Sequence, residues 1–188
     1  MEPHILNLDI APIETERLII RSPQPGDGPE FNAAICETLP ELQEWLGIYP
    51  DGPPTGKQTE AFVRQKYADF VLRQDLMLLC FLKETHTFVL SSGLHPRWSV
   101  PSFEIGYWCR KSYQRQGYVT EAVNGIATFA VDSLNAKRVF ICCDVDNHAS
   151  ANVARRAGFE LEGTLRHTGR KQNGALSDAY YFAKIRPD

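Results

Sequence analysis

Residues that could hold an anion and move protons gather between Glu104 and the loop 114–120. The loop consists of Gln114, Arg115, Gln116, Gly117, Tyr118, Val119 and Thr120. It joins an expected strand to an expected helix, whose first N–H groups have no helical acceptor and whose dipole favours negative charge. Gly117 has no Cβ and lets a bound group approach the backbone, and Arg115 adds a positive charge. The loop therefore predicts a site for a phosphate-bearing ligand.

A second polar segment begins at Asn147, thirty residues after Gly117. Asn147 and Ser150 open an expected helix that ends near Gly158, and Arg156 lies in its last turn. Asparagine and serine at a helix start bond the free N–H groups, and arginine at a helix end complements the dipole. Each of these three side chains can therefore either bind a ligand or stabilise its helix.

Apolar periodicity predicts the elements that position these residues. Alternation over 103–109 indicates a strand, and apolar residues at three- and four-residue spacing over 122–134 indicate a helix. Further strands are expected over 17–21, 76–83, 88–94, 138–145, 160–171 and 176–185, and further helices over 30–39, 42–48, 59–74 and 148–157.

Capping residues, prolines and turn residues set the expected ends of the helices and strands. We expect Asp27 to cap the first helix, Pro40 to end it, and His95-Pro96 to end the strand over 88–94. We expect the turn Gln172-Asn173-Gly174 to close the final hairpin, because Asn-Gly favours such turns. One apolar face of the 59–74 helix is expected to hold Ala61, Phe62, Tyr67, Phe70 and Val71.

The composition indicates one soluble α/β domain over residues 1–188, with 43% hydrophobic and 23% charged residues. Five cysteines without a C-x-x-C spacing argue against a disulfide framework or a zinc site, so we expect no metal and a reducing compartment. No apolar run is long enough to cross a bilayer, and the first ten residues do not resemble a signal peptide. The expected location is the cytoplasm, without membrane contact.

Charge is unevenly distributed along the chain. Residues 1–100 carry a net charge of −6 and residues 101–188 a net charge of +3. A basic C-terminal half suits a polyphosphate, and an acidic N-terminal half suits a cationic acceptor such as an amine, although ordinary surfaces vary this much by chance. The acidic balance and the lack of a basic aromatic patch disfavour a nucleic-acid partner. A homodimer is left open.

Two segments resemble the signature of the GNAT acetyltransferases. The loop has the spacing Q-x-x-G-x-V, similar to the family pattern Q/R-x-x-G-x-G/A, with Val119 departing from the final small residue. Segment 144–159 is similar to the family's N-x-x-S/A…G-F segment, with Asn147, Ser150 and Gly158 in register. The stretches TERLIIR, EIGYW and GYxTEA further resemble the RimJ/RimL-like branch, whose members acetylate protein N-termini.

The resemblance implies a single GNAT-type domain of α/β (α+β) class. Its sheet would be mixed and mostly antiparallel, with about seven strands, flanked by helices and splayed at the central strand. The cosubstrate would be acetyl-CoA. Its phosphates would bind residues 114–120, with Arg156 as an additional cation. Its pantetheine would pair with the backbone of Trp108, Cys109 and Arg110 and with the Asn147 side chain, and backbone amides of this strand would polarise the thioester.

Two residues would carry the proton transfers. Many family members protonate the leaving thiolate with a tyrosine seven residues beyond the asparagine, which here is Ala154, so the resemblance assigns this role to Ser150. Glu104 would deprotonate the acceptor amine directly or through a water. An α-amine is already about 14% neutral at pH 7 and a lysine about 0.04%, which modestly favours an α-amine acceptor for a weak base.

The sequence therefore predicts an N-acetyltransferase acting on a primary amine, with a protein N-terminal α-amine as the preferred acceptor. The alternatives are a small-molecule amine, such as a polyamine, an amino acid or an antibiotic, and a non-catalytic acyl-CoA-binding module. Trp45 and Tyr49 suit either an acceptor pocket or the core. The remaining candidates for chemistry are expected to be solvated or loop histidines: His86, His95, His148 and His167.

Overall fold

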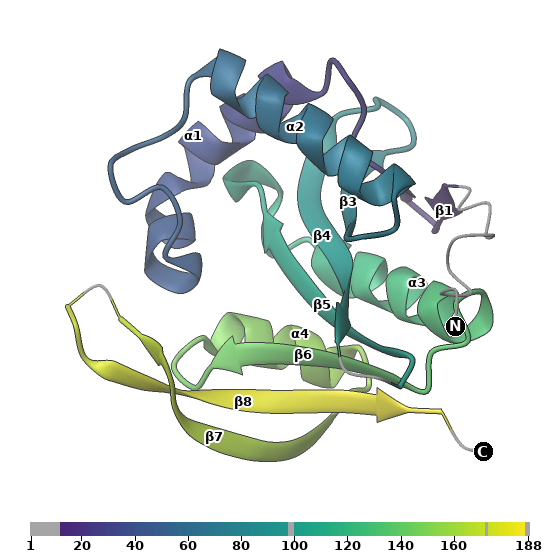
Figure 1. Ribbon diagram of the computed structural model, residues 1–188, viewed down its shortest axis with the longest axis vertical. Coiled ribbons are helices and arrows are strands. Elements are labelled where there is room, and N and C mark those ends of the chain that lie inside the picture. Colours follow the sequence, from purple (N-terminus) through teal and green to yellow (C-terminus); the bar gives the residue numbers. More distant parts are fainter. Residues whose placement is uncertain (1–11, 98–99, 172, 187–188) are drawn as a thin grey trace.

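The computed structural model describes residues 12–97, 100–171 and 173–186, which form one sheet with helices on both faces (Figure 1). The strands are β1 (Ile13–Glu14), β2 (Leu18–Arg21), β3 (Leu76–Leu82), β4 (Phe88–Arg97), β5 (Ser102–Cys109), β6 (Arg138–Asp144), β7 (Glu160–Arg170) and β8 (Leu176–Ile185). The helices are α1 (Gly28–Leu46), α2 (Gly56–Val71), α3 (Tyr118–Asp132) and α4 (His148–Arg156). The expected mixed α/β domain is confirmed, with the two-residue β1 as an additional strand.

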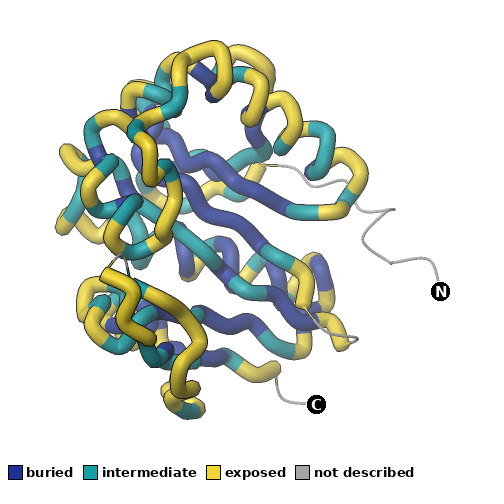
Figure 2. Tube along the Cα trace, turned by 60° about the vertical axis from the view of Figure 1, so that its left-hand side comes forward, coloured by how far each residue is buried: buried dark blue, intermediate teal, exposed yellow. Residues whose placement is uncertain are grey.

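The strand order is β1-β2-β3-β4-β5-β6-β8-β7. Strand β3 has the sequence LMLLCFL, and six of its seven residues are buried. Leu76, Leu78 and Cys80 pack in the core shared with α3 and α4, whereas Met77 and Leu79 pack in a second core with α1. Alternate strand residues face opposite sides, so a continuous apolar strand needs helices on both. Figure 2 shows the buried central strands and the exposed β7.

Helix α3 crosses the sheet behind β4 and β5 and connects β5 to β6 (Figure 1). Its expected apolar face is confirmed, because Val123, Ile126 and Ala130 are fully buried. Gly125 lies on the other side of the helix, where a Cβ would stand 2.7 Å from Thr15 Cγ2. The glycine thus lets the segment after β1 pack closely on α3, where Thr15 donates a hydrogen bond to Glu121.

The central strands β5 and β6 are parallel and pair only over Ser102, Phe103 and Glu104 of β5. All other neighbouring strands are antiparallel. Beyond Glu104, β5 continues to Cys109 paired with β4, and β6 continues to Asp144 paired with β8. The expected splay at the central strand is confirmed, and it begins at Glu104.

The two proline-based boundaries are wrong. Helix α1 continues through Pro40 and ends at Gly47, where φ is 63°. A proline removes one helical hydrogen bond, but Ile35 and Leu42 are buried on either side of it, and this packing holds the helix together. Strand β4 likewise continues through His95 and Pro96, because Pro96 lies near the strand end, where a missing N–H costs little.

Asp27 occupies the N-cap position of α1 but does not cap it. Its carboxylate instead accepts hydrogen bonds from Arg21 at 2.7 and 2.8 Å and from the Gln24 N–H. The Gly28 N–H donates to Glu60 of α2 at 3.1 Å, so the neighbouring helix supplies the acceptor for the α1 terminus.

Helix α2 begins earlier than expected, at Gly56, because Thr55 and Gln58 form a capping box. Of the five residues of the expected apolar face, only Phe70 is buried. Thr59, Val63 and Phe70 are buried, whereas Phe62 is 39% and Val71 54% exposed. Among the described helices, none is long and apolar enough to cross a membrane.

The closing hairpin is confirmed in the residues that are described. Gly174 has a φ of 84°, and its N–H donates to the Lys171 carbonyl at 2.9 Å. Gln172 lies outside the described residues.

Candidate active site

The loop 114–120 has the geometry expected of an anion site. Gly117 adopts a φ of 85° and precedes the first residue of α3, and the first helical hydrogen bond runs from the Glu121 N–H to the Gly117 carbonyl at 3.0 Å. The N–H groups of residues 117–120 precede this bond and fall outside the helical pattern. Arg115 and Gly117 are exposed. These amides therefore form a surface rich in hydrogen-bond donors beside the positive end of the helix dipole.

Arg17 supports this loop from the other end of the chain. Its Nη1 donates to the Gln116 carbonyl at 3.1 Å, and its guanidinium lies 4.2 Å from the centre of the Tyr118 ring. The sequence analysis used this residue only as part of a family-like stretch and missed its contact with the loop. A separation of 99 residues leaves no local pattern from which to infer it.

Glu121 in the first turn of α3 joins Arg17 to the helix. Its carboxylate accepts from Thr15 Oγ1 at 2.6 Å and from Arg17 N and Nε at 2.7 Å each. Burial raises the pKa of Glu121, but these hydrogen bonds and the Arg17 charge lower it more, so its pKa lies below the usual range. The carboxylate is therefore paired, and Arg17 offsets the negative charge that it brings near the anion site.

The two glutamines of the loop donate to the chain itself. Gln114 Nε2 donates to the Cys109 carbonyl at 3.1 Å, and Gln116 Nε2 donates to the Ser112 carbonyl at 3.0 Å. Their side chains thus shape the loop, and the backbone amides are the groups left to meet an anion.

The side chains at the end of β5 are engaged within the protein. Trp108 packs between Phe31 and Phe88, with ring centres 5.4 and 5.8 Å away. Arg110 Nε donates to Glu37 at 2.7 Å, and burial raises the pKa of the Cys109 thiol to about 12. Only the backbone of this segment can therefore pair with a ligand, along the edge that β6 leaves at the splay.

Asn147 and Ser150 lie together at the start of α4, across the splay from β5. Asn147 Oδ1 accepts from the Ser150 N–H at 3.0 Å, which is the expected cap. Ser150 Oγ lies 2.9 Å from the hydroxyl of Tyr107 on β5, and this hydroxyl also donates to the Ser150 carbonyl at 3.2 Å. The contact joins the two sides of the splay.

Tyr107 was not singled out from the sequence, where it is one residue of the alternation over 103–109; its contact with Ser150 adds it to the candidate site. Burial raises its pKa far above the usual value, although the Ser150 hydrogen bond lowers it somewhat. The phenol therefore keeps its proton at neutral pH.

Arg156 is not brought into these contacts. It is exposed in the last turn of α4, at the opposite end of the helix from Asn147. A cation there suits the helix dipole.

Polar side chains from three segments meet beside the start of the splay. His95 Nδ1 lies 2.5 Å from Asp75 Oδ1, and Lys66 Nζ lies 3.2 Å from Asp75 Oδ2. His95 thus lies in β4 and is paired, contrary to the expectation of a solvated or loop histidine. Its register partner is Glu104, whose carboxylate accepts from Arg97 Nε at 3.0 Å. Glu104 therefore lies beside His95 in the sheet and forms an ion pair with Arg97.

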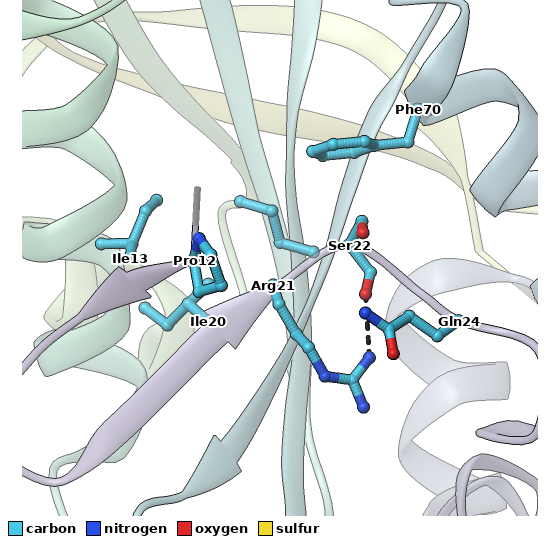
Figure 3. A pocket seen from close by; sticks show the side chains of 8 residues that line it. Pro12, Ile13, Ile20, Arg21, Ser22, Gln24 and Phe70 are labelled. Carbon is cyan, nitrogen blue, oxygen red and sulfur yellow. Dashed lines mark hydrogen bonds between the residues drawn. The ribbon is translucent and has the colours of Figure 1, made fainter. Parts of the chain in front are cut away.

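Two hollows among the described residues lie away from this arrangement. One, of about 140 Å³, lies between β2 and α2, where Arg21 Nη1 donates to the Ser22 carbonyl at 2.9 Å (Figure 3). The other, of about 490 Å³, runs along α3 beside β1. Neither is lined by residues of β5 or of the loop 114–120, so strand and loop geometry define the candidate site.

Comparison with known proteins assigns the family. Residues 17–160 match the acetyltransferase (GNAT) domain. The chain belongs to this family. The acetyltransferase is 28% identical over 178 residues to YdaF of Bacillus subtilis (strain 168), named as a ribosomal N-acetyltransferase, covering 91% of this chain and 92% of that protein. It is 43% identical over 77 residues to the ribosomal-protein-serine acetyltransferase of Escherichia coli (strain K12), covering 41% of this chain and 40% of that protein.

Solved structures agree with this assignment. The ribosomal-protein α-N-acetyltransferase RimL, in complex with coenzyme A, superposes with a TM-score of 0.81 at 25% identity, covering 94% of this chain and 98% of that one. The acetyltransferase MccE, in complex with acetyl-CoA and AMP, shares the fold with a TM-score of 0.80 at 24% identity, covering 91% and 93%. The chain is therefore an N-acetyltransferase of the RimL-like type.

Proposed function

We propose that the acetyltransferase transfers acetyl from acetyl-CoA to the α-amine of a protein N-terminus. The observation that carries the proposal is the similarity to RimL over nearly the whole of both chains, together with the relatedness to the ribosomal-protein-serine acetyltransferase. A ribosomal protein is accordingly the first acceptor to test. The expected location is the cytoplasm, and a homodimer stays a prediction.

The donor is proposed to lie across the splay. Its phosphates bind the amides of 117–120, with Arg115 and Arg17 as neighbouring cations and Arg156 as a more distant one. Its pantetheine follows the free edge of β5 at Trp108, Cys109 and Arg110. Asn147 uses Oδ1 to cap α4, so its amide NH₂ is the group that can donate to pantetheine.

The chemistry is proposed to be direct attack on the thioester. The nitrogen lone pair of the neutral amine attacks the carbonyl carbon, β5 amides stabilise the oxyanion, and the C–S bond breaks. Ser150 gives its proton to the departing thiolate. The proton that the acylated nitrogen then loses restores the Ser150 hydroxyl, with the Tyr107 hydroxyl, 2.9 Å from Oγ, as a relay that ends with its own proton in place. Glu104 is the candidate that the family resemblance gives for taking the proton from the incoming ammonium.

The test is transfer of isotope-labelled acetyl from acetyl-CoA into a cell extract, followed by mass spectrometry of its protein and small-molecule fractions. Label on protein α-amines supports the proposal and names the target. Label confined to small molecules contradicts the protein acceptor while keeping the acetyltransferase chemistry. Coenzyme A binding without label in either fraction contradicts turnover and favours a binding module.

A further inference from the structure

We infer that His95, held by Asp75, takes the proton from the acceptor ammonium. The inference rests on the proposed amine acetylation and adds a residue that receives the proton. His95 comes from β4, Asp75 from the segment between α2 and β3, and the thioester would lie along β5.

The contact with Asp75 fixes how the imidazole presents itself. Burial raises the pKa of Asp75, but its hydrogen bonds with His95 and Lys66 lower that pKa by more, so its pKa lies below the usual value. Asp75 is therefore a carboxylate at neutral pH. A carboxylate 2.5 Å from Nδ1 accepts a hydrogen bond, which places a proton on Nδ1. In the neutral imidazole, Nε2 then carries the free lone pair and can accept a proton. No described residue forms a hydrogen bond with Nε2.

Two glycines make room for the ring over the sheet. A Cβ on Gly93 would lie 3.0 Å from both Cε1 and Nε2 of His95, and a Cβ on Gly106 would lie 3.5 Å from Nε2. Any larger residue at 93 would displace the imidazole. Nε2 therefore lies over the β5 backbone at Gly106, two residues beyond the last residue that pairs with β6.

This position is the one from which an amine would reach the thioester. The proposed thioester site lies along β5 from Gly106 onward, and the imidazole covers the face of the strand that Glu104 and Trp108 share. The imidazole is partly open, with 29% of its side chain exposed. A base must come within hydrogen-bond reach of the proton that it removes, directly or through one water, and Nε2 is placed for either.

Glu104 is the competing base and is less suited. Its Oε2 already accepts from Arg97, and the pair lies at the strand ends. The Glu104 carboxylate is thus engaged in an ion pair, whereas Nε2 of His95 has no hydrogen-bond partner among the described residues. The charged groups that surround the imidazole are Asp75, Lys66, Asp69, Arg97 and Glu104.

The step is balanced in protons and electrons. Nε2 takes one proton from the ammonium, and the nitrogen lone pair so released forms the new N–C bond as the C–S bond breaks. The acylated nitrogen then loses a second proton, which replaces the proton that Ser150 gives to the thiolate. One proton is therefore left over, on Nε2. The positive charge on the imidazolium is offset by Asp75. After the amide leaves, Nε2 returns its proton to water.

The test compares His95→Gln with Glu104→Gln on whichever acceptor the wild-type protein acetylates, chosen from α-amine peptides and small amines. Acetylation of small amines alone would overturn the proposed protein acceptor, and His95 is then tested on that amine. The expected result for His95→Gln is a loss of about 100-fold in kcat/KM with an unchanged Kd for coenzyme A. His86→Asn, in a turn outside the site, is the matched control, since asparagine tolerates its φ of 56°.

The pH profile separates a base from a structural residue. With His95 in place, the acidic limb of kcat/KM should lie below the titration of the acceptor amine, because a base of the protein removes the amine proton. In His95→Gln this limb should move up to the titration of the acceptor amine, about pH 8 for an α-amine, because only already neutral amine can react. Added imidazole should restore activity to His95→Ala. An unmoved limb without rescue, or a loss confined to Glu104→Gln, would overturn the proposal.

Discussion

Two regions beside β5 are built in different ways: the proposed donor side and the proposed acceptor side. The donor side, around Gly117 and α3, is a contiguous loop whose backbone is fixed by contacts from Arg17 and Glu121. The acceptor side, around His95, is assembled from side chains of α2, β4 and the segment between α2 and β3. A ligand on the donor side therefore meets mainly backbone amides, whereas an acceptor meets side chains. Backbone recognition tolerates sequence change, and side-chain recognition does not.

The largest expected effect tests the donor side. Gly117→Val should raise the Kd for coenzyme A about 100-fold, roughly 2.7 kcal/mol, measured by calorimetry. A branched side chain is strained at a φ of 85°. Its Cβ would also lie 3.4 Å from Nη2 of Arg17, the residue whose Nη1 bonds the loop at Gln116.

The matched control lies in the 49–56 loop, which we count with the acceptor side because it contains Tyr49, a residue that the sequence allows in an acceptor pocket. Gly52→Val carries the same kind of backbone strain, at a φ of 108°, but opens onto empty space in the 49–56 loop. It should leave the Kd for coenzyme A unchanged. An equal rise in both variants would mean that lost stability, and not the loop, weakens binding.

The next effect concerns the contact that joins β5 to α4 across the splay. Ser150→Ala should lower kcat by about 10- to 100-fold and Tyr107→Phe by about 3- to 10-fold, because each removes one hydroxyl of the proposed proton path. Steady-state kinetics measures both. Coenzyme A affinity serves as the control, since the Asn147 cap uses the Ser150 backbone and survives the substitution. Full activity in Ser150→Ala would rule out the proposed acid.

Glu121→Gln should destabilise the donor side in a pH-dependent way. The pKa of Glu121 is lowered in the folded protein, so its contribution is present above the unfolded value of about 4.3 and is lost as pH falls through the folded value. At pH 7 the free energy of unfolding should fall by about 1 kcal/mol, a modest value because Arg17 is partly solvated. Urea unfolding should show the wild-type advantage shrink and then disappear as the pH falls below the unfolded value of about 4.3. An advantage that persists there would contradict the ion pair as its source.

The smallest effect tests the acceptor side. Asn32 Nδ2 donates to the Pro54 carbonyl at 2.7 Å and to Thr59 Oγ1 at 2.8 Å, and so ties the 49–56 loop to α1. Asn32→Ala should raise the KM for the acceptor about threefold as the loop loosens, with coenzyme A affinity unchanged. A change in coenzyme A affinity alone would contradict the division between the two sides.

The same difference explains what the sequence could predict. The loop 114–120 and the cap at Asn147 are local patterns, so their geometry could be derived from spacing. Arg17, Tyr107 and His95 could not be recognised, because the partners that reveal them lie 104, 43 and 20 residues away. The helix end expected at Pro40 is wrong for a related reason. The packing that stabilises α1 on both sides of Pro40 comes from residues distant in the sequence.

The short pairing between β5 and β6 has a mechanical consequence. Each half of the sheet is hydrogen-bonded within itself, and only three residue pairs of the sheet join them. Widening the splay between β5 and β6 therefore breaks few sheet hydrogen bonds. Helix α3 contacts β4, β5 and β6 and so packs against both halves of the sheet. A small parting of the two halves would therefore leave every strand of the sheet intact.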